Sequence, residues 1–200
     1  MSAAPLGAAM RALQRLRAPG DVVVTTMGPA REWMALGPLD PLDFVLVPSS
    51  MGQATSLGLG LALARPDHRI VVVNGDGSML MNLGSLVTIA AERPANLVVI
   101  VADNGAYEVT GAQPTPGAAA GRAGRDRVDY AGLARAAGFG SVYRFTTLAE
   151  WAEGLEAALG GAGPVFVWLD VTADSAIGGP RSPGPAGERA RRFMEALGGR

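Results

Sequence analysis

The stretch IVVVNGDGS at residues 70–78 joins a run of apolar, mostly β-branched residues to an aspartate flanked by glycines. A continuous apolar run of this kind is typical of a strand that is covered on both faces. The glycines beside Asp76 permit a tight turn and let backbone N–H groups approach an anion. Ser78 adds a hydroxyl group near the start of the next helix, where phosphate is favoured. We therefore predict a ligand-binding turn at the carboxyl end of a buried strand.

A second apolar run, residues 97–102, ends in Asp103-Asn104 and follows a segment, residues 82–92, whose pattern predicts a helix. Strand, helix and strand at this spacing form a βαβ unit, which implies parallel strands and a right-handed crossover. If the two strands are neighbours, Asp76 and Asn104 converge at one edge of the sheet. A carboxylate, an amide oxygen and a nearby backbone carbonyl form a set of hard oxygen ligands. Mg²⁺ takes such a set while keeping places for phosphate oxygens and water.

The same alternation extends along the rest of the chain. It predicts an α/β fold, a doubly wound, mostly parallel sheet of about five or six strands flanked by helices on both faces. The other predicted strands are residues 21–26, 44–47, 141–145 and 165–171, and the other predicted helices are residues 5–17, 31–36, 49–65, 130–137, 148–159 and 188–197.

Glycine and proline mark the predicted interruptions. Gly28-Pro29 is expected to break the chain, and residues 105–127 are expected to form a long loop, which in a compact domain is usually functional or disordered. Many small residues within 49–65 predict close approach of a helix to a neighbouring backbone or a ligand. We place the main domain at residues 1–172. Residues 173–200 are predicted to be a Gly/Pro-rich arm and a terminal helix that could dock on a partner.

Composition excludes several classes of site. The chain has no cysteine, so disulfides, thiolate-bound zinc, cysteinyl iron–sulfur clusters and a cysteine nucleophile are excluded. Its one histidine, His68, lies in a polar stretch that predicts a surface turn rather than a catalytic site. The formal net charge of −1 favours neither nucleic acid nor an anionic membrane as a partner. The N-terminus does not resemble a secretory signal, and no segment approaches a membrane span, so we expect a cytoplasmic protein.

Gly75-Asp76-Gly77, followed after 26 residues by Asn104, resembles the signature of thiamine-diphosphate enzymes. The resemblance implies the thiamine-diphosphate-binding fold and a Mg²⁺ ion held against the cofactor's diphosphate. Its protein ligands would be Asp76, Asn104 and the carbonyl of Ala106. Asp103 stands where this family often has another asparagine.

Other segments extend the resemblance to the rest of the cofactor. In the segment Ser49-Ser50-Met51-Gly52, the carbonyl of Ser49 would receive the pyrimidine amino group, and Met51 would wedge between the two rings. The alternative for Met51 is simple core filling. Thr25-Thr26-Met27-Gly28 is similar to a loop that touches the diphosphate. The implied cofactor-binding residues are Thr26, Ser49, Met51, Gly75, Asp76, Gly77, Ser78, Asn104, Ala106 and Tyr107.

Residues 49–60, 74–90 and 103–115 closely resemble the β subunits of sulfopyruvate decarboxylases and are similar to the cofactor half of phosphonopyruvate decarboxylases. The resemblance implies decarboxylation of a 2-oxoacid, first of all 3-sulfopyruvate to sulfoacetaldehyde and CO₂. Gln113 and Thr115 would lie near the substrate, with arginines of the same loop as alternatives. Tyr107 is often followed by glycine in this branch, and Glu108 departs from that pattern.

The resemblance also implies a partner. In this family the glutamate that activates the aminopyrimidine comes from a separate pyrimidine-binding domain of about 150–180 residues. We expect that domain on another polypeptide, an α subunit, in a hetero-oligomer of at least α2β2. Glu32 and Glu108 are less favoured local candidates for the activating carboxylate.

Four other functions remain open. The chain could serve a phosphonopyruvate or other 2-oxoacid decarboxylase, or be the β subunit of a 2-oxoacid:ferredoxin oxidoreductase. It could also be a non-catalytic cofactor-binding or regulatory subunit, or a flavodoxin-like nucleotide binder that reached the same loops by chance.

Overall fold

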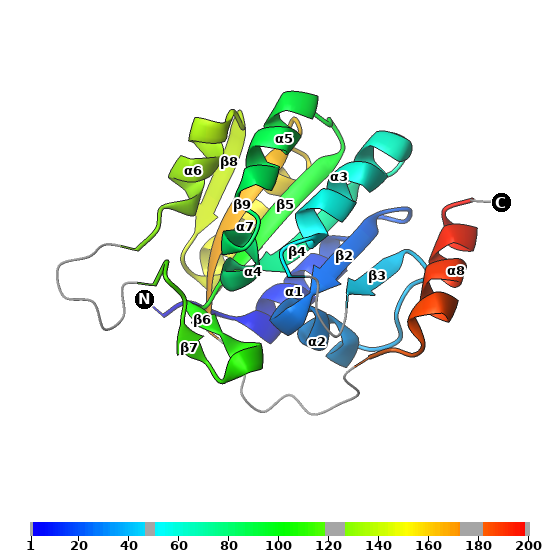
Figure 1. Cartoon of the computed structure of the whole chain (residues 1–200), viewed down its shortest axis with the longest axis horizontal. Helices are drawn as coiled ribbons and strands as arrows, with labels where there is room; N and C mark the ends of the chain where they lie inside the picture. Colours follow the sequence, from blue (N-terminus) through cyan, green and yellow to red (C-terminus); the bar gives the residue numbers. More distant parts are fainter. Residues whose placement is uncertain (1, 47–50, 119–126, 173–181, 199–200) are drawn as a thin grey trace.

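A single sheet of seven parallel strands forms the centre of the molecule (Figure 1). The computed structural model describes residues 2–46, 51–118, 127–172 and 182–198. Across the sheet, the strands are β3 (Asp43–Leu46), β2 (Val22–Thr26), β4 (Ile70–Gly75), β5 (Leu97–Asp103) and β9 (Val165–Thr172), with β8 (Ser141–Phe145) and the short β1 (Ala4–Pro5) sharing the far edge of β9. The predicted doubly wound α/β fold is confirmed.

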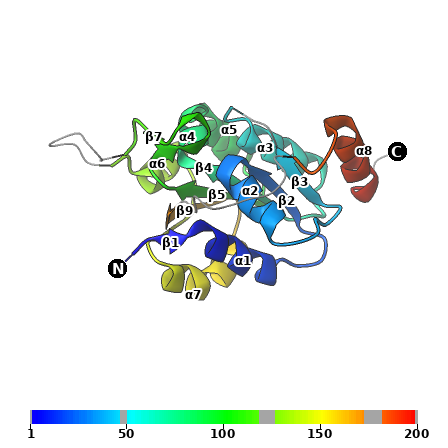
Figure 2. The same ribbon diagram turned by 90° about the horizontal axis from the view of Figure 1, so that it is seen from below.

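Helices cover both faces of this sheet (Figure 2). One face carries α1 (Leu6–Leu16), α2 (Met27–Ala35) and α7 (Leu148–Leu159), and the other carries α3 (Ala54–Ala64), α5 (Gly84–Glu92), α6 (Tyr130–Ala137) and α8 (Ala186–Ala196). The two faces therefore hold two separate apolar cores. This double covering explains why β4, β5 and β9 are apolar without alternation. None of the helices in the described part of the chain is long and apolar enough to cross a bilayer.

The predicted break at Gly28-Pro29 is wrong. Helix α2 begins at Met27, directly after β2, and includes both residues in its first turn. Proline is compatible with that place because the first N–H groups of a helix have no intrahelical partner. The strand therefore passes into a helix at the edge of the sheet where ligands bind in such folds.

The segment 105–127 is not one long loop. It begins with an antiparallel hairpin of β6 (Ala106–Tyr107) and β7 (Gln113–Pro114), joined by the single 3-10 turn η1 (Glu108–Thr110). Strands of two residues are too short to give a periodic signal in the sequence. A short helix, α4 (Asp76–Leu80), likewise begins at Asp76, whereas the sequence pattern predicts a turn there and a helix over residues 82–92.

Helix α8 packs on the chain's own sheet. The ring of Phe193 lies 4.7 Å from that of Phe44 on β3, and Phe193 belongs to the same core as β4 and β5. The terminal helix thus covers the β3 edge, which would otherwise be open to pairing. The proposed domain boundary at residue 172 and docking of this helix on a partner stay predictions.

The small residues of α3 serve helix-on-sheet packing. A Cβ atom on Gly58 would lie 2.2 Å from Cγ2 of Val72, whereas a Cβ atom on Gly60 would meet nothing within 4 Å. Glycine is therefore required at position 58 but not at position 60. The two positions form a matched pair, because both lie inside one helix.

We predict opposite effects of alanine at these two positions. Gly58→Ala should lower the free energy of unfolding by about 1–3 kcal/mol, since the added methyl group overpacks against β4. Gly60→Ala should raise it by up to about 1 kcal/mol, because alanine favours an exposed helical position. Urea unfolding of the two variants measures both, and equal shifts would contradict the packing of α3 described above.

Candidate functional site

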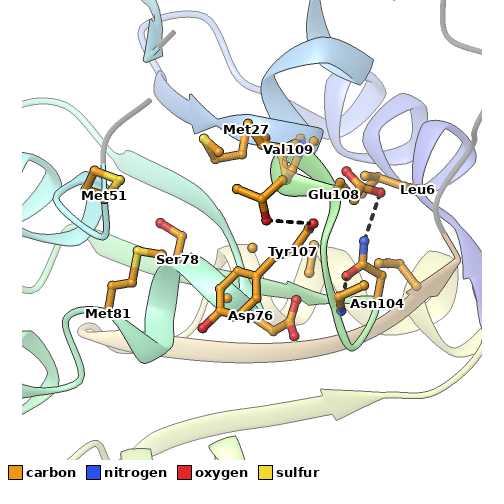
Figure 3. Close-up of a pocket in the computed structure, with 18 residues that line it drawn as sticks. Leu6, Met27, Met51, Asp76, Ser78, Met81, Asn104, Tyr107, Glu108 and Val109 are labelled. Carbon is orange, nitrogen blue, oxygen red and sulfur yellow. Dashed lines mark hydrogen bonds between the residues drawn. The ribbon is translucent and has the colours of Figure 1, made fainter. Parts of the chain in front are cut away.

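A pocket opens at the carboxyl ends of β2, β4, β5 and β9 (Figure 3). In the sheet, β2 lies between β3 and β4. The chain leaves β2 towards β3 on one side and then crosses to β4 on the other side, so the strand order reverses at this pocket. Reversal points of this kind are the usual ligand sites of open α/β sheets. The pocket is lined by Leu6, Met27, Gly28, Pro29, Met51, Gly75, Asp76, Gly77, Ser78, Met81, Ala102, Asn104, Ala106, Tyr107, Glu108, Val109, Thr110 and Val171.

The pairing of β4 with β5 brings the two predicted metal ligands together. Gly75 is in register with Ala102, so Asp76 and Asn104 follow neighbouring strands at the same edge and line the same pocket. Tyr107 closes over this junction, because a Cβ atom on Gly77 would lie 2.5 Å from its ring. Glycine at position 77 therefore allows the hairpin to lie against the start of α4.

Asp76 is almost fully buried, and its environment disfavours the charged carboxylate. Burial, together with the negative charge of Asp103, raises the pKa of Asp76 to about 7. The Thr115 hydroxyl donates to Asp76 Oδ2 at 3.0 Å and partly opposes this shift. A cation beside Asp76 would offset both causes of the raised pKa.

Asp103 is held by three donors and cannot turn freely. Its carboxylate accepts from the Trp168 indole at 2.9 Å and from the Gly105 amide at 3.0 Å, and forms an ion pair with Arg127 at 2.6 Å. Arg127 also pairs with Asp170 at 3.2 Å. The buried Asp103 carboxylate is thus paired with a partly exposed arginine, and the pair anchors the chain at residue 127.

The third predicted metal ligand, the carbonyl of Ala106, belongs to the backbone of the hairpin. Thr115 N donates to Gly105 O at 2.8 Å, and Ala112 N donates to Tyr107 O at 2.9 Å. Successive carbonyls of a strand point to opposite sides, so the Ala106 carbonyl points away from β7. Its partner in register is Pro114, which has no N–H to give. Asp76, Asn104 and this carbonyl therefore fit a Mg²⁺ ion.

Ser78 and two methionines complete the walls of the pocket. Ser78 Oγ is buried without a hydrogen-bond partner among the described residues, and is available to an incoming phosphate. Met27 and Met51 both have left-handed backbones, with φ of 58° and 46°. Such strain in bulky residues is concentrated at functional sites. Met51 is 64% exposed, so it does not fill the core.

Some predicted site residues lie elsewhere. Thr26 is fully buried beside the pocket and does not line it. The side chain of Gln113 is exposed and folds back on Thr110. Thr115 contacts Asp76 rather than open space. Ser49 lies outside the described residues. The cofactor and substrate roles of these residues stay predictions.

The structure also adds residues that the sequence pattern did not indicate. Leu6 comes from α1, far away in the sequence, and no local signal marks it. Glu108 also lines the pocket, whereas the sequence indicates it only as a less favoured candidate for the activating carboxylate. The other local candidate, Glu32, packs against Gly7 of α1 and does not line the pocket. His68 lies at the amino end of β4, opposite the pocket, and contacts Gly20 O at 2.7 Å.

The raised pKa of Asp76 predicts a pH-dependent gain in stability for Asp76→Asn. The ordinary pKa of 3.8 rises to about 7 in the fold, so stability of the metal-free chain falls as the pH rises through this window. A neutral amide avoids the penalty. Thermal unfolding in EDTA should show the variant more stable by at least ~2 °C at pH 8, with the gain shrinking towards pH 4. The exposed Glu153→Gln serves as control, and a gain that is independent of pH would contradict the assignment.

Comparison with known proteins was made at the level of sequence and of fold. The phosphonopyruvate decarboxylase of Streptomyces viridochromogenes is 41% identical over 186 residues, which cover 91% of this chain and 44% of that protein. The sulfopyruvate decarboxylase subunit beta of Methanothermobacter thermautotrophicus is 40% identical over 152 residues, 76% of this chain and 74% of the relative. The chain thus spans less than half the length of the phosphonopyruvate decarboxylases that it matches.

A solved structure has the same fold at low sequence identity. A putative thiamin diphosphate-dependent enzyme from Mycobacterium smegmatis superposes with a TM-score of 0.67 at 19% identity, over 86% of this chain and 32% of the other. The family described as thiamine pyrophosphate enzyme, C-terminal TPP binding domain, matches residues 26–169, from the last residue of β2 into β9. Since this match spans most of the chain, including the whole β4–β5 junction, the chain belongs to the thiamine pyrophosphate enzymes, whose C-terminal cofactor-binding domain it contains.

Proposed function

We propose that this chain is the cofactor-binding β subunit of a thiamine-diphosphate- and Mg²⁺-dependent 2-oxoacid decarboxylase. The observation that carries the proposal is the junction of β4 and β5, where Asp76, Asn104 and the Ala106 carbonyl supply hard oxygen donors. A cation bound beside Asp76 would offset the free-energy cost of burying this charged carboxylate.

The protein's own part in the reaction is binding and orientation. When bound, thiamine diphosphate supplies the electron sink that allows CO₂ to leave a 2-oxoacid. Asp76 and Asn104 would hold the metal against the diphosphate, and the buried hydroxyl of Ser78 would donate to a phosphate oxygen. Met51, exposed at the pocket wall, would brace the cofactor from the side.

The first candidate substrate is 3-sulfopyruvate, which would give sulfoacetaldehyde and CO₂. Support comes from the sulfopyruvate decarboxylase subunit beta of Methanothermobacter thermautotrophicus, of which the alignment covers 74%. Phosphonopyruvate is a second candidate, because relatives with that activity align over nine tenths of this chain. Both substrates are 2-oxoacids with a tetrahedral oxyanion at the far end.

A partner subunit is part of the proposal. Around the pocket, Met51 and Val109 are 64% and 60% exposed, and Met81 is half exposed. Exposed apolar side chains gathered at one place commonly mark a protein interface. We propose that a pyrimidine-binding α subunit covers this rim and brings the activating glutamate, in a hetero-oligomer of at least α2β2.

Removal of the metal or of the Asp76 carboxylate should strongly weaken cofactor binding. Calorimetry with thiamine diphosphate should give binding in Mg²⁺ but little in EDTA, for the chain alone or with its partner. Asp76→Ala should weaken the Mg²⁺-dependent binding at least about tenfold, since it removes a charged ligand. His68→Ala, at the other end of β4, should bind as the wild type does. Equal affinity with and without Mg²⁺ would contradict the metal site.

Purification of the native complex tests the partner and the substrate together. The chain should be recovered with a second polypeptide that contains the pyrimidine-binding domain. That complex should release CO₂ from 3-sulfopyruvate faster than from phosphonopyruvate or pyruvate. Faster release from phosphonopyruvate would assign the second candidate, and a complex that binds the cofactor without releasing CO₂ from any 2-oxoacid would sink the proposed activity.

A further inference from the structure

Glu108 lies in the pocket between Asn104 and the start of α2 (Figure 3). It is the first residue of η1, the turn that joins the two strands of the hairpin. The Asn104 amide nitrogen, Nδ2, donates to Glu108 Oε1 at 2.8 Å. A carboxylate that faces the pocket for cofactor and metal is therefore already engaged with one of the predicted metal ligands.

The contacts of Asn104 determine which way its amide faces. Asn104 Oδ1 accepts from Ala106 N at 2.9 Å, and Nδ2 donates to Glu108. A backbone N–H can only donate and a carboxylate can only accept, so the two contacts select the same orientation. The amide oxygen, which retains a further lone pair, then lies on the side of Ala106, and the NH₂ group is turned away.

We propose that Glu108 is a positioning residue that holds the amide of Asn104 with its oxygen available to the metal ion. The inference rests on the proposed function, because it gives a role to a residue beside the Asp76–Asn104 site. A metal ion is repelled by an NH₂ group and bound by an amide oxygen, so the rotation of this one side chain decides whether the site has its second ligand. Partners that orient ligands in this way often govern metal affinity.

Gly28 keeps the Glu108 carboxylate in place from the other side. A Cβ atom at position 28 would lie 2.5 Å from Glu108 Oε2 and 3.6 Å from Leu6 Cδ2. The carboxylate therefore lies between the first turn of α2 and the Asn104 amide, with little room to move. Because residue 28 lies in the first turn of α2 and residue 108 is the first residue of η1, this contact ties the hairpin to the opposite wall of the pocket.

Two substitutions at position 108 separate hydrogen bonding from charge. Glu108→Gln keeps an oxygen that can accept from Asn104, whereas Glu108→Ala removes it. The measurement is calorimetric titration of Mg²⁺ into the full chain with saturating thiamine diphosphate, alone and with its partner subunit. We expect the dissociation constant of Mg²⁺ to rise about tenfold or more in Glu108→Ala and to stay within about threefold in Glu108→Gln. The exposed Glu153→Ala serves as the matched control.

The readout distinguishes positioning from a general loss of structure. Thermal unfolding in EDTA should be unchanged or improved in Glu108→Ala, because only the orientation of the metal ligand is affected. Gly28→Ala should weaken Mg²⁺ binding in the wild type but much less in a Glu108→Ala background, because both changes disturb one contact.

Wild-type affinity in Glu108→Ala, or equal losses in the alanine and glutamine variants, would overturn the inference and leave the proposed function intact. Absence of Mg²⁺-dependent cofactor binding in the wild type, both alone and with the partner, would overturn both.

Discussion

The hydrogen-bonded pairing of β4 with β5 is the constraint on which the site depends. Two parallel strands that begin in register also end together, so Asp76 and Asn104 arrive at the same edge of the sheet. Several walls of the pocket follow directly from these two strands or lie beside them. Helix α4 begins at Asp76, the hairpin follows Asn104, and α2 opens beside them from the next strand.

The same junction is unfavourable for folding without a ligand. Asp76 is buried next to Asp103, and the Thr115 hydroxyl that donates to it is neutral. Asp103, by contrast, is matched by Arg127 and by the Trp168 indole. The chain therefore pairs Asp103 with a cationic side chain, whereas the proposed Mg²⁺ ion would supply the missing positive charge at Asp76. The buried Asp76 carboxylate lowers the stability of the ligand-free fold, which is a common cost of a binding site.

The hairpin β6–η1–β7, with the residue that follows it, contacts Gly77, Asn104 and Asp76. Its first strand presents the Ala106 carbonyl, and Tyr107 packs over Gly77. Its turn carries Glu108 to the Asn104 amide, and the residue after β7, Thr115, returns to Asp76. A hairpin with two-residue strands has little stability of its own. The contacts with Gly77, Asn104 and Asp76 therefore hold the hairpin in place as much as the hairpin completes the proposed metal site.

The sequence by itself determined the buried strands, because unbroken apolar runs of this kind are suited to strands that are covered by helices on both faces. It also determined the Asp76 and Asn104 positions, because the glycine-flanked turn and the βαβ spacing are local features. Only the tertiary structure decided that Leu6 and Gly28 wall the pocket, that Arg127 pairs with Asp103, and that Glu108 meets Asn104. Most of these contacts join different secondary-structure elements, and Glu108 lies in a turn that is too short to give a periodic signal in the sequence. Tertiary packing brings these residues together.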